Sequence, residues 1–383
     1  MVATGLEILI SEKLDQLKAL NVGIVANHAS VTKDLTHISD ALFSAGVSIA
    51  ALFGPEHGAR GEVADGEPIE DSIDERLGVP VYSLYGKNRS PSKEMLGDID
   101  LMIIDLQDVG ARFYTFLYTA ALVMKACGEY GVPVWVLDRP NPITGTNPEG
   151  PILEPEFASF VGMYPIAQRH GLTIGELANL FSSHFGVKCD LKIIRMHGWS
   201  RQLWFDETGL PWVLPSPNMP TLDTAVVYPG MCILEGTNVS EGRGTTKPFE
   251  LFGAPWIEPA DLKNLLVDYK LPGVAFREAH FIPTASKFAG SHCAGLQLHV
   301  MERREFRPVL TGVAVVAALL QLYPDKFSFR SPSAEGKYHF DLLCGTSSVR
   351  EALQEGVSPW DIASTWDGKL AEYTMLCKEV YLY

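Results

Sequence analysis

Carboxylate, amide and guanidinium side chains gather in one glycine-rich stretch past the midpoint of the chain. Residues 234–256 read LEGTNVSEGRGTTKPFELFGAPW. The hydrogen-bonding side chains of this stretch include Glu235, Asn238, Ser240, Glu241 and Arg243. A loop that only connects two elements needs one or two turn residues. The density of polar side chains therefore predicts a loop that holds a polar ligand.

Three acidic residues are candidates for catalysis. Glu56 lies in the glycine-flanked sequence GPEHG, where its side chain can project into a cleft, Glu241 lies in the loop above, and Asp105 ends an apolar run. Paired carboxyls suit glycoside hydrolysis, because one with a raised pKa protonates the leaving oxygen while the other acts as base or nucleophile. The alternative for Glu235 and Glu241 is a charge pair with Arg243.

A buried parallel sheet is expected to position these side chains. Short apolar runs without polar alternation predict strands buried on both faces at residues 21–27, 47–54, 99–108 and 132–141. Helical periodicity ending in glycine follows at residues 34–46, 115–131 and 172–186. This alternation predicts the α/β class, with a Rossmann-like, doubly wound, mostly parallel sheet over residues 1–212. The sequence becomes proline-rich near residue 212. An α+β domain over residues 213–383 is expected to follow and to close an active-site cleft against the first domain.

A polar cluster follows each of the four predicted strands. Ligands of open α/β sheets bind outside the carboxyl ends of the strands. The predicted substrate-binding residues from this half are Asn27, His57, Arg60, Gln107, Asp108, Arg112, Tyr114, Asp138 and Asn141. The alternative is that these residues are helix caps and loop salt bridges.

Composition and missing motifs exclude several other functions. The net charge of −15 argues against nucleic acid or an anionic membrane as the main partner. The sequence has no GxGxxG, no P-loop and no HExxH, and its six cysteines include no CxxC pair. Ser240 lacks the first glycine of a nucleophile elbow. We therefore expect no cofactor and no metal.

The sequence also bears on the compartment. No run of about 18 uncharged apolar residues occurs, so no membrane span is expected. The first 22 residues lack a basic segment ahead of a long apolar run and do not read as a signal peptide. A cytoplasmic protein is the resulting expectation.

Five long motifs together carry a resemblance to a known family. They are GPEHGARGEVADGE, DLQDVGARFYT, LDRPNPITG, PSPNMPTLDTAVVYPG and EGTNVSEGRGTTKPFELFGAPW. With these motifs, the chain resembles the NamZ-type exo-β-N-acetylmuramidases from about Val22 to its C-terminal EVYLY. The resemblance implies a bacterial glycoside hydrolase of cell wall recycling. Such an enzyme releases N-acetylmuramic acid from the non-reducing end of peptidoglycan fragments.

The resemblance also implies roles for particular residues. Glu56 falls on the family's motif glutamate, and the site lies between the two domains. Residues brought to it are Asp105, Gln107, Asp108, Arg112, Tyr114, Asn218, Asn238, Ser240, Glu241 and Arg243. The expected partner is a small carbohydrate, a disaccharide or muropeptide, bound by a monomer or homodimer.

Several alternatives stay open at the level of sequence. An arginine is expected to hold the lactyl carboxylate of muramic acid, with Arg243 as the first candidate and Arg112 or Arg60 as the next. A non-catalytic muropeptide-binding or sensing protein is the competing function, and a hydrolase of the ether or amide of muramyl derivatives is a third. The stereochemical outcome of hydrolysis is open.

Overall fold

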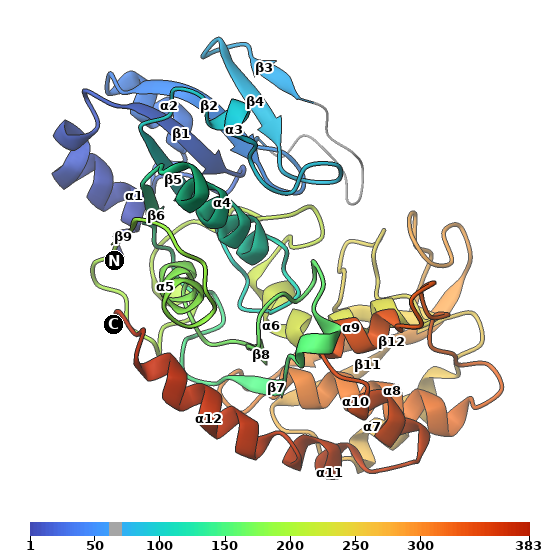
Figure 1. Cartoon of the computed structure of the whole chain (residues 1–383). Helices are drawn as coiled ribbons and strands as arrows, with labels where there is room; N and C mark the ends of the chain where they lie inside the picture. The colour runs from blue at the N-terminus through green and yellow to red at the C-terminus, as the bar shows by residue number, and fades with distance from the viewer. Residues whose placement is uncertain (61–70) are drawn as a thin grey trace.

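The first half of the chain forms a seven-stranded sheet (Figure 1). The structure is a computed structural model that describes residues 1–60 and 71–383, so residues 61–67 of the GPEHGARGEVADGE motif lie outside the described residues. Strand order is β3-β4-β2-β1-β5-β6-β9, and every pair is parallel except β3 with β4. The strands are β1 (Asn21–Ala26), β2 (Ser48–Gly54), β3 (Ser72–Asp74), β4 (Val79–Ser83), β5 (Leu101–Asp105), β6 (Val134–Leu137) and β9 (Leu191–Ile194).

Helices cover both faces of this sheet. Successive side chains of a strand point to opposite faces, so each strand contributes to two apolar cores. Val25 and Ile104 enter one core and Ile24 and Ile103 the other. The first core includes α4 (Phe116–Tyr130) and α5 (Ile174–His184), and the second includes α1 (Gly5–Ile8) and α2 (Ile38–Ser44). The short α3 (Lys93–Leu96) lies between β4 and β5 in the chain. The predicted α/β class is confirmed.

The second half adds a three-stranded antiparallel sheet and further helices. Its strands, in the order β10-β12-β11, are β10 (Leu251–Ala254), β11 (Val274–Phe281) and β12 (Cys293–Val300). Its helices are α6 (Leu222–Met231), α7 (Pro259–Asp268), α8 (Pro308–Leu322), α9 (His339–Cys344), α10 (Ser348–Gln354), α11 (Pro359–Ser364) and α12 (Asp367–Lys378).

Helices α6 and α8 pack with almost no space between their backbones. A Cβ added at Gly230 would lie 1.8 Å from the Pro308 carbonyl oxygen, and one at Gly312 would lie 2.3 Å from the Gly230 oxygen. Only glycine permits this approach. The YPG sequence that ends the proline-rich motif therefore sets the contact between two long helices of the second half.

Arg112 joins the two halves through the small sheet of β7 (Glu149–Ile152) and β8 (Ala167–Arg169). Its guanidinium is fully buried and donates to the carbonyl oxygens of Pro151 at 2.6 Å, Ile166 at 2.9 Å and Leu343 at 2.8 Å. Leu343 belongs to α9, nearly the other end of the chain. The structure thus gives Arg112 a structural place in the interior instead of the predicted contact with substrate.

The C-terminal residues return to the first half, so the two ends of the chain lie near each other (Figure 1). The Tyr383 hydroxyl donates to Asp138 Oδ2 at 2.7 Å and accepts from the Met196 backbone N–H at 2.7 Å. Burial raises the pKa of Asp138 to about 7, although the Gly175 N–H, Tyr383 and the Thr173 hydroxyl act in the opposite direction. Asp138 therefore fastens α5 and the C-terminus.

Among the residues described, the structure has no helix long and apolar enough to cross a membrane.

The C-terminal contact yields a stability prediction. Tyr383→Phe removes an acceptor from the Met196 N–H and a donor from Asp138, and we expect it to lower the free energy of unfolding by about 1–3 kcal/mol. The loss should grow as pH rises through about 7, because the ionised carboxylate is the form that needs the donor. Urea unfolding at pH 5 and pH 8 measures both effects.

The matched control is Tyr130→Phe at the exposed end of α4. It should leave stability unchanged at either pH. A Tyr383→Phe variant as stable as this control would contradict the structural role of the hydroxyl.

Candidate active site

Glu56 occupies the corner of a tight turn at the end of β2. The Gly58 N–H donates to the Pro55 carbonyl at 3.0 Å, and His57 has a φ of 77°, as the third residue of a type II turn requires. A non-glycine residue in this conformation is strained, which is common at functional sites. A Cβ at Gly54 would lie 2.5 Å from the Ala59 nitrogen. The GPEHG sequence thus builds a turn whose corner residue is Glu56.

The Glu56 carboxyl lies at the start of helix α4. The Thr115 hydroxyl, which precedes the first residue of that helix, donates to Glu56 Oε2 at 3.0 Å. Thr115 makes no side-chain cap for the helix itself, so its hydroxyl serves the glutamate. Glu56 is partly buried. One oxygen of the predicted catalytic acid is therefore held in a defined orientation.

Two histidines flank this glutamate at the carboxyl ends of neighbouring strands. His57 follows Glu56 in the turn, and His28 follows β1. Burial lowers the pKa of His28, a hydrogen bond to the Leu214 backbone raises it, and the charge of His57 lowers it further. His28 is not among the predicted site residues. The same pattern that identifies Asn27, a polar residue at the end of a buried strand, also applies to His28.

Asn27 holds the proline-rich PSPN segment against the end of β1. Its Nδ2 donates to the Pro215 carbonyl at 3.0 Å. Asn218, three residues further along this segment, is partly buried. The structure therefore brings the predicted Asn218 segment to the strand end that carries His28, and gives Asn27 the task of fixing it there.

Asp105 is part of a buried ion pair. Its carboxylate accepts from Arg139 Nε and, at 2.7 Å, from Arg139 Nη2, and Asp105 is fully buried. A bidentate arginine holds both oxygens. The predicted catalytic role of Asp105 has no support in this geometry. Asp138, described above, is likewise bonded inside the fold.

Three further predicted residues bond to their own neighbourhood. Gln107 Nε2 donates to the Asp108 and Pro140 carbonyls, at 2.7 and 2.9 Å. Asp108 Oδ2 lies 3.0 Å from His170 Nε2, and Asn141 Nδ2 donates to the Leu172 carbonyl at 2.9 Å. All three are buried. Their contacts therefore agree with the alternative interpretation, in which these residues fix loops of the protein.

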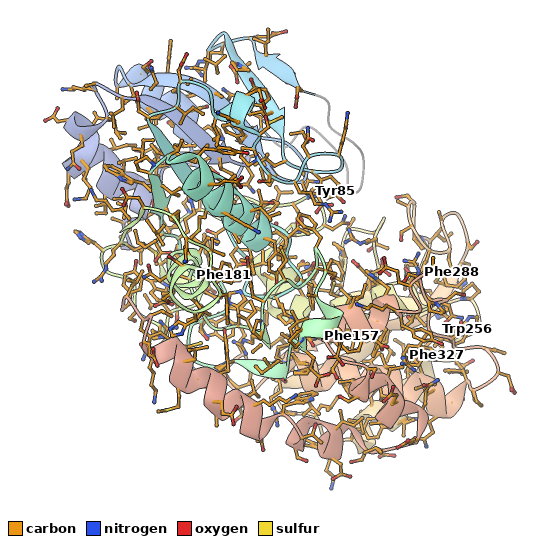
Figure 2. The ribbon with its side chains drawn as sticks, in the orientation of Figure 1. Tyr85, Phe157, Phe181, Trp256, Phe288 and Phe327 are labelled. Carbon is orange, nitrogen blue, oxygen red and sulfur yellow. The ribbon has the colours of Figure 1, made fainter. Side chains whose placement is uncertain are left out.

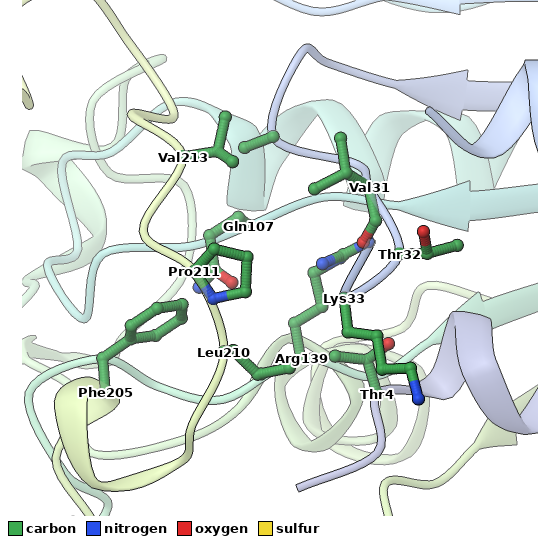
Figure 3. A pocket seen from close by; sticks show the side chains of 11 residues that line it. Thr4, Val31, Thr32, Lys33, Gln107, Arg139, Phe205, Leu210, Pro211 and Val213 are labelled. Atoms are coloured by element: carbon green, nitrogen blue, oxygen red, sulfur yellow. The ribbon is translucent and has the colours of Figure 1, made fainter. Parts of the chain in front are cut away.

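Gln107 and Arg139 also line a small pocket next to the sheet (Figure 3). Phe205 and Pro211 form another part of its wall (Figure 3). Its volume of about 20 Å³ is room for about one water. A sugar does not fit there.

Arg60, another candidate for binding the lactyl carboxylate, forms ion pairs with two aspartates near the β3 edge of the sheet. Its Nε donates to Asp74 at 2.7 Å and its Nη2 to Asp40 at 3.1 Å. These two acids raise the pKa of Arg60. The guanidinium is thus already paired with carboxylates of the protein.

The glycine-rich loop does line a large pocket, of about 520 Å³. Of the predicted residues, Glu235, Asn238, Glu241 and Arg243 form its wall, joined by Thr237, Ser286, Lys287 and Arg330. Ser240 is buried behind the wall, where its hydroxyl accepts from the Gly242 N–H at 3.2 Å. Lys287 and Arg330 are pocket residues that sequence reasoning missed, because they lie 31 and 74 positions beyond Trp256, the end of the loop stretch.

Both acids of this pocket are paired with cations. Glu235 pairs with Arg243, as the alternative interpretation states, whereas the nearest cation to Glu241 is Lys287, with Arg243 at 3.6 Å. Arg243 donates from Nε and Nη2 to Glu235 Oε1, at 3.1 and 2.7 Å. Burial disfavours the Glu235 carboxylate, but Arg243 and His339 overcome this and lower its pKa to about 2. Lys287 Nζ lies 2.8 Å from Glu241 Oε2.

A chain of aromatic rings connects this pocket with the Glu56 turn. Tyr114, next to Thr115, packs edge-on against Tyr228 with ring centroids 6.3 Å apart. Tyr228 in turn packs on Phe249, and the Arg243 guanidinium lies 5.2 Å from the Phe249 ring. In Figure 2 the labelled Tyr85 and Phe288 lie on the facing sides of the two halves. The motif of Tyr114 and the loop of Arg243 are thus joined through packed, buried aromatic rings.

Within residues 1–60 and 71–383, no group of three or more histidine, cysteine, aspartate or glutamate side chains is arranged to hold a metal ion.

Known proteins resemble the chain over its whole length. The family model described as exo-beta-N-acetylmuramidase NamZ, N-terminal, matches residues 22–223, and the corresponding C-terminal model matches residues 226–383. The peptidoglycan beta-N-acetylmuramidase NamZ of Bacillus subtilis strain 168 is 47% identical over 383 residues, which is 100% of this chain and 91% of that protein.

Two crystal structures of DUF1343 family proteins from Bacteroides fragilis NCTC 9343 share the fold. One has a TM-score of 0.93 at 35% identity and the other a TM-score of 0.81 at 29% identity. In each case the match covers 100% of this chain and 99% of the crystallised one.

The buried pair of the pocket gives a second prediction. Lys287→Met removes the nearer cation of the almost fully buried Glu241 and leaves it only Arg243 Nε at 3.6 Å, and we expect a loss of about 2–4 kcal/mol in the free energy of unfolding. Glu241→Gln alone should also destabilise. The double variant should be more stable than the sum of the two losses, because neither charge is then left alone. A thermal or urea double-mutant cycle measures the coupling, and strictly additive losses would contradict the pair.

Proposed function

We propose the function of this chain from its family and its site: the chain belongs to the exo-beta-N-acetylmuramidase NamZ family, whose two domains together match nearly all of it. It is a glycoside hydrolase, an exo-β-N-acetylmuramidase that hydrolyses the β-1,4 glycosidic bond and releases N-acetylmuramic acid from the non-reducing end of peptidoglycan fragments. The observation that carries this function is the full-length identity of 47% to a peptidoglycan beta-N-acetylmuramidase. The presentation of Glu56 at a strand end agrees with it.

Glu56 is the proposed general acid. The turn projects its carboxyl at the edge where ligands of open α/β sheets bind, and the Thr115 hydroxyl orients it. In its protonated form this carboxyl donates a proton to the glycosidic oxygen as the bond to the anomeric carbon breaks. Thr115 is a positioning residue that acts through Glu56.

The pocket of the glycine-rich loop is proposed to receive the sugar. Its volume of about 520 Å³ is in the range of small-molecule sites, and its wall offers amide, hydroxyl and cationic groups. Glu235, Asn238 and Glu241 fix the shape of this wall through their bonds to Arg243, the 326–328 backbone and Lys287. His28, His57 and Asn218 are proposed to line the sugar site on the side of Glu56.

The role of Glu56 predicts a dependence on the leaving group. Glu56→Gln should lower kcat by about 10²–10⁴ on a natural disaccharide, N-acetylmuramic acid β-1,4-linked to N-acetylglucosamine, because the departing hydroxyl needs a proton. A nitrophenyl β-glycoside of N-acetylmuramic acid should lose much less, since nitrophenolate leaves without protonation. Steady-state kinetics on both substrates measures the ratio.

The matched control is Glu129→Gln on the exposed last turn of α4. It should leave both rates unchanged. Equal losses on the two substrates would instead make Glu56 a nucleophile or base. Binding without turnover in the unaltered protein would favour the muropeptide-binding alternative.

The Thr115 contact predicts a smaller, specific effect. Thr115→Val removes the hydroxyl but no helix cap, and we expect about a tenfold fall in kcat on the disaccharide with KM nearly unchanged. The basic limb of the pH–rate profile should move, because a general acid must keep its proton and this limb reports the loss of that proton from the carboxyl that Thr115 contacts. Thr115→Ser should restore both. A fall in kcat without a displaced pH profile would assign Thr115 a purely structural role.

A further inference from the structure

The loop pocket has three cationic side chains against two carboxylates, which leaves one positive charge uncompensated. The cations of its wall are Arg243, Lys287 and Arg330, and the acids are Glu235 and Glu241. Two of the cations are held by the protein itself. The contacts of the three cations show which one remains available to a ligand.

Lys287 and Arg243 serve to fix the loop. The Lys287 ammonium donates to the Leu234 carbonyl at 2.7 Å and the Thr237 carbonyl at 3.1 Å, and lies 2.8 Å from Glu241. The ammonium of Lys287 therefore has two carbonyl acceptors and a carboxylate beside it, all within the protein. Arg243 places two of its N–H groups on Glu235 and lies 3.6 Å from Glu241.

Arg330 differs from both in its contacts. Its side chain is exposed and lines the pocket, and in the part of the chain that the structure describes no carboxylate lies within ion-pair distance of it. Its backbone is fixed, because its N–H donates to the Gly236 carbonyl at 2.9 Å and the preceding Phe329 pairs with Thr237.

Asn238 reinforces this attachment of the 326–330 segment. Its side chain donates to the Lys326 carbonyl at 2.8 Å and accepts from the Ser328 N–H at 3.0 Å. The guanidinium of Arg330 is thus a cation on a rigid support at the edge of the pocket, without a carboxylate of the described chain to neutralise it.

We propose that Arg330 is the specificity-determining residue that recognises the lactyl carboxylate of N-acetylmuramic acid. Muramic acid differs from glucosamine by this one carboxylate-bearing ether. A guanidinium binds a carboxylate through two parallel hydrogen bonds, which gives direction as well as charge. The proposal rests on the proposed function, and it replaces Arg243, whose guanidinium is committed to Glu235, as the residue that selects the sugar.

The test compares substrates that differ only in the charge of the lactyl group. Arg330→Ala should lower kcat/KM about 10- to 100-fold on a nitrophenyl β-glycoside of N-acetylmuramic acid. It should leave kcat/KM unchanged on the same glycoside with its lactyl carboxyl converted to the amide. Arg330→Lys should recover part of the loss, since the charge returns without the planar pair of donors. Arg304→Ala, at an exposed arginine outside the pocket, is the matched control and should change neither value.

Binding of the free sugars separates this proposal from the proposed function. Calorimetry should show that N-acetylmuramic acid binds more tightly than N-acetylglucosamine to the unaltered protein, and that Arg330→Ala removes this difference. If the unaltered protein hydrolyses the glycoside but Arg330→Ala discriminates as before, or loses both substrates equally, the proposal is wrong while the function stands. If binding depends on Arg330 but no glycoside is hydrolysed, the function fails and the proposal stands. If the unaltered protein shows no preference for the acidic sugar, the proposal fails.

Discussion

The arrangement of the two halves depends on one buried guanidinium. Arg112 lies in the interior, where burial lowers its pKa to about 10, and three carbonyl groups, from β7, the residue before β8 and α9, accept its hydrogen bonds. A buried charge is tolerated only when such partners surround it. A Cβ at Gly345 would lie 2.7 Å from Arg112 Nη2, so the end of α9 must be glycine to admit it. Because Tyr114 and Thr115 follow Arg112 by two and three residues, this constraint also places the aromatic rings that lie between the Glu56 turn and the loop pocket.

The loop pocket illustrates how polar side chains can produce rigidity. The sequence alone shows a glycine-rich stretch. In the structure, its polar side chains bond to one another, to Lys287 and to the backbone of residues 326–328. Groups held in place before a ligand arrives need no rearrangement when it binds, which favours electrostatic recognition. The loop is therefore a fixed wall, and the sugar is expected to meet a preformed set of donors.

The sequence was sufficient to predict the parallel sheet, the strand ends that carry polar residues, the glycine-flanked segment of Glu56 and a polar loop, which lines a pocket in the structure. Strands buried on both faces have a distinct pattern, and GPEHG contains the glycines that its turn needs. The sequence could not predict which charged side chains pair with each other, because the partners lie far apart along the chain. Asp105 ends β5 and Arg139 lies two residues beyond the neighbouring β6, and only the geometry of the sheet decides that they bind each other and not a ligand. Arg330 lies too far along the chain for any local pattern to connect it with the loop.

The environments of the carboxyls also divide their roles. Ion pairing with Arg243 and His339 overcomes the effect of burial and gives Glu235 a pKa of about 2, so this residue carries no proton near neutral pH and is excluded as a general acid. Glu56 has a different setting, with a single hydroxyl donor and no ion pair within the described chain. The two carboxyls therefore differ in their partners, because cations hold Glu235 whereas a neutral hydroxyl holds Glu56.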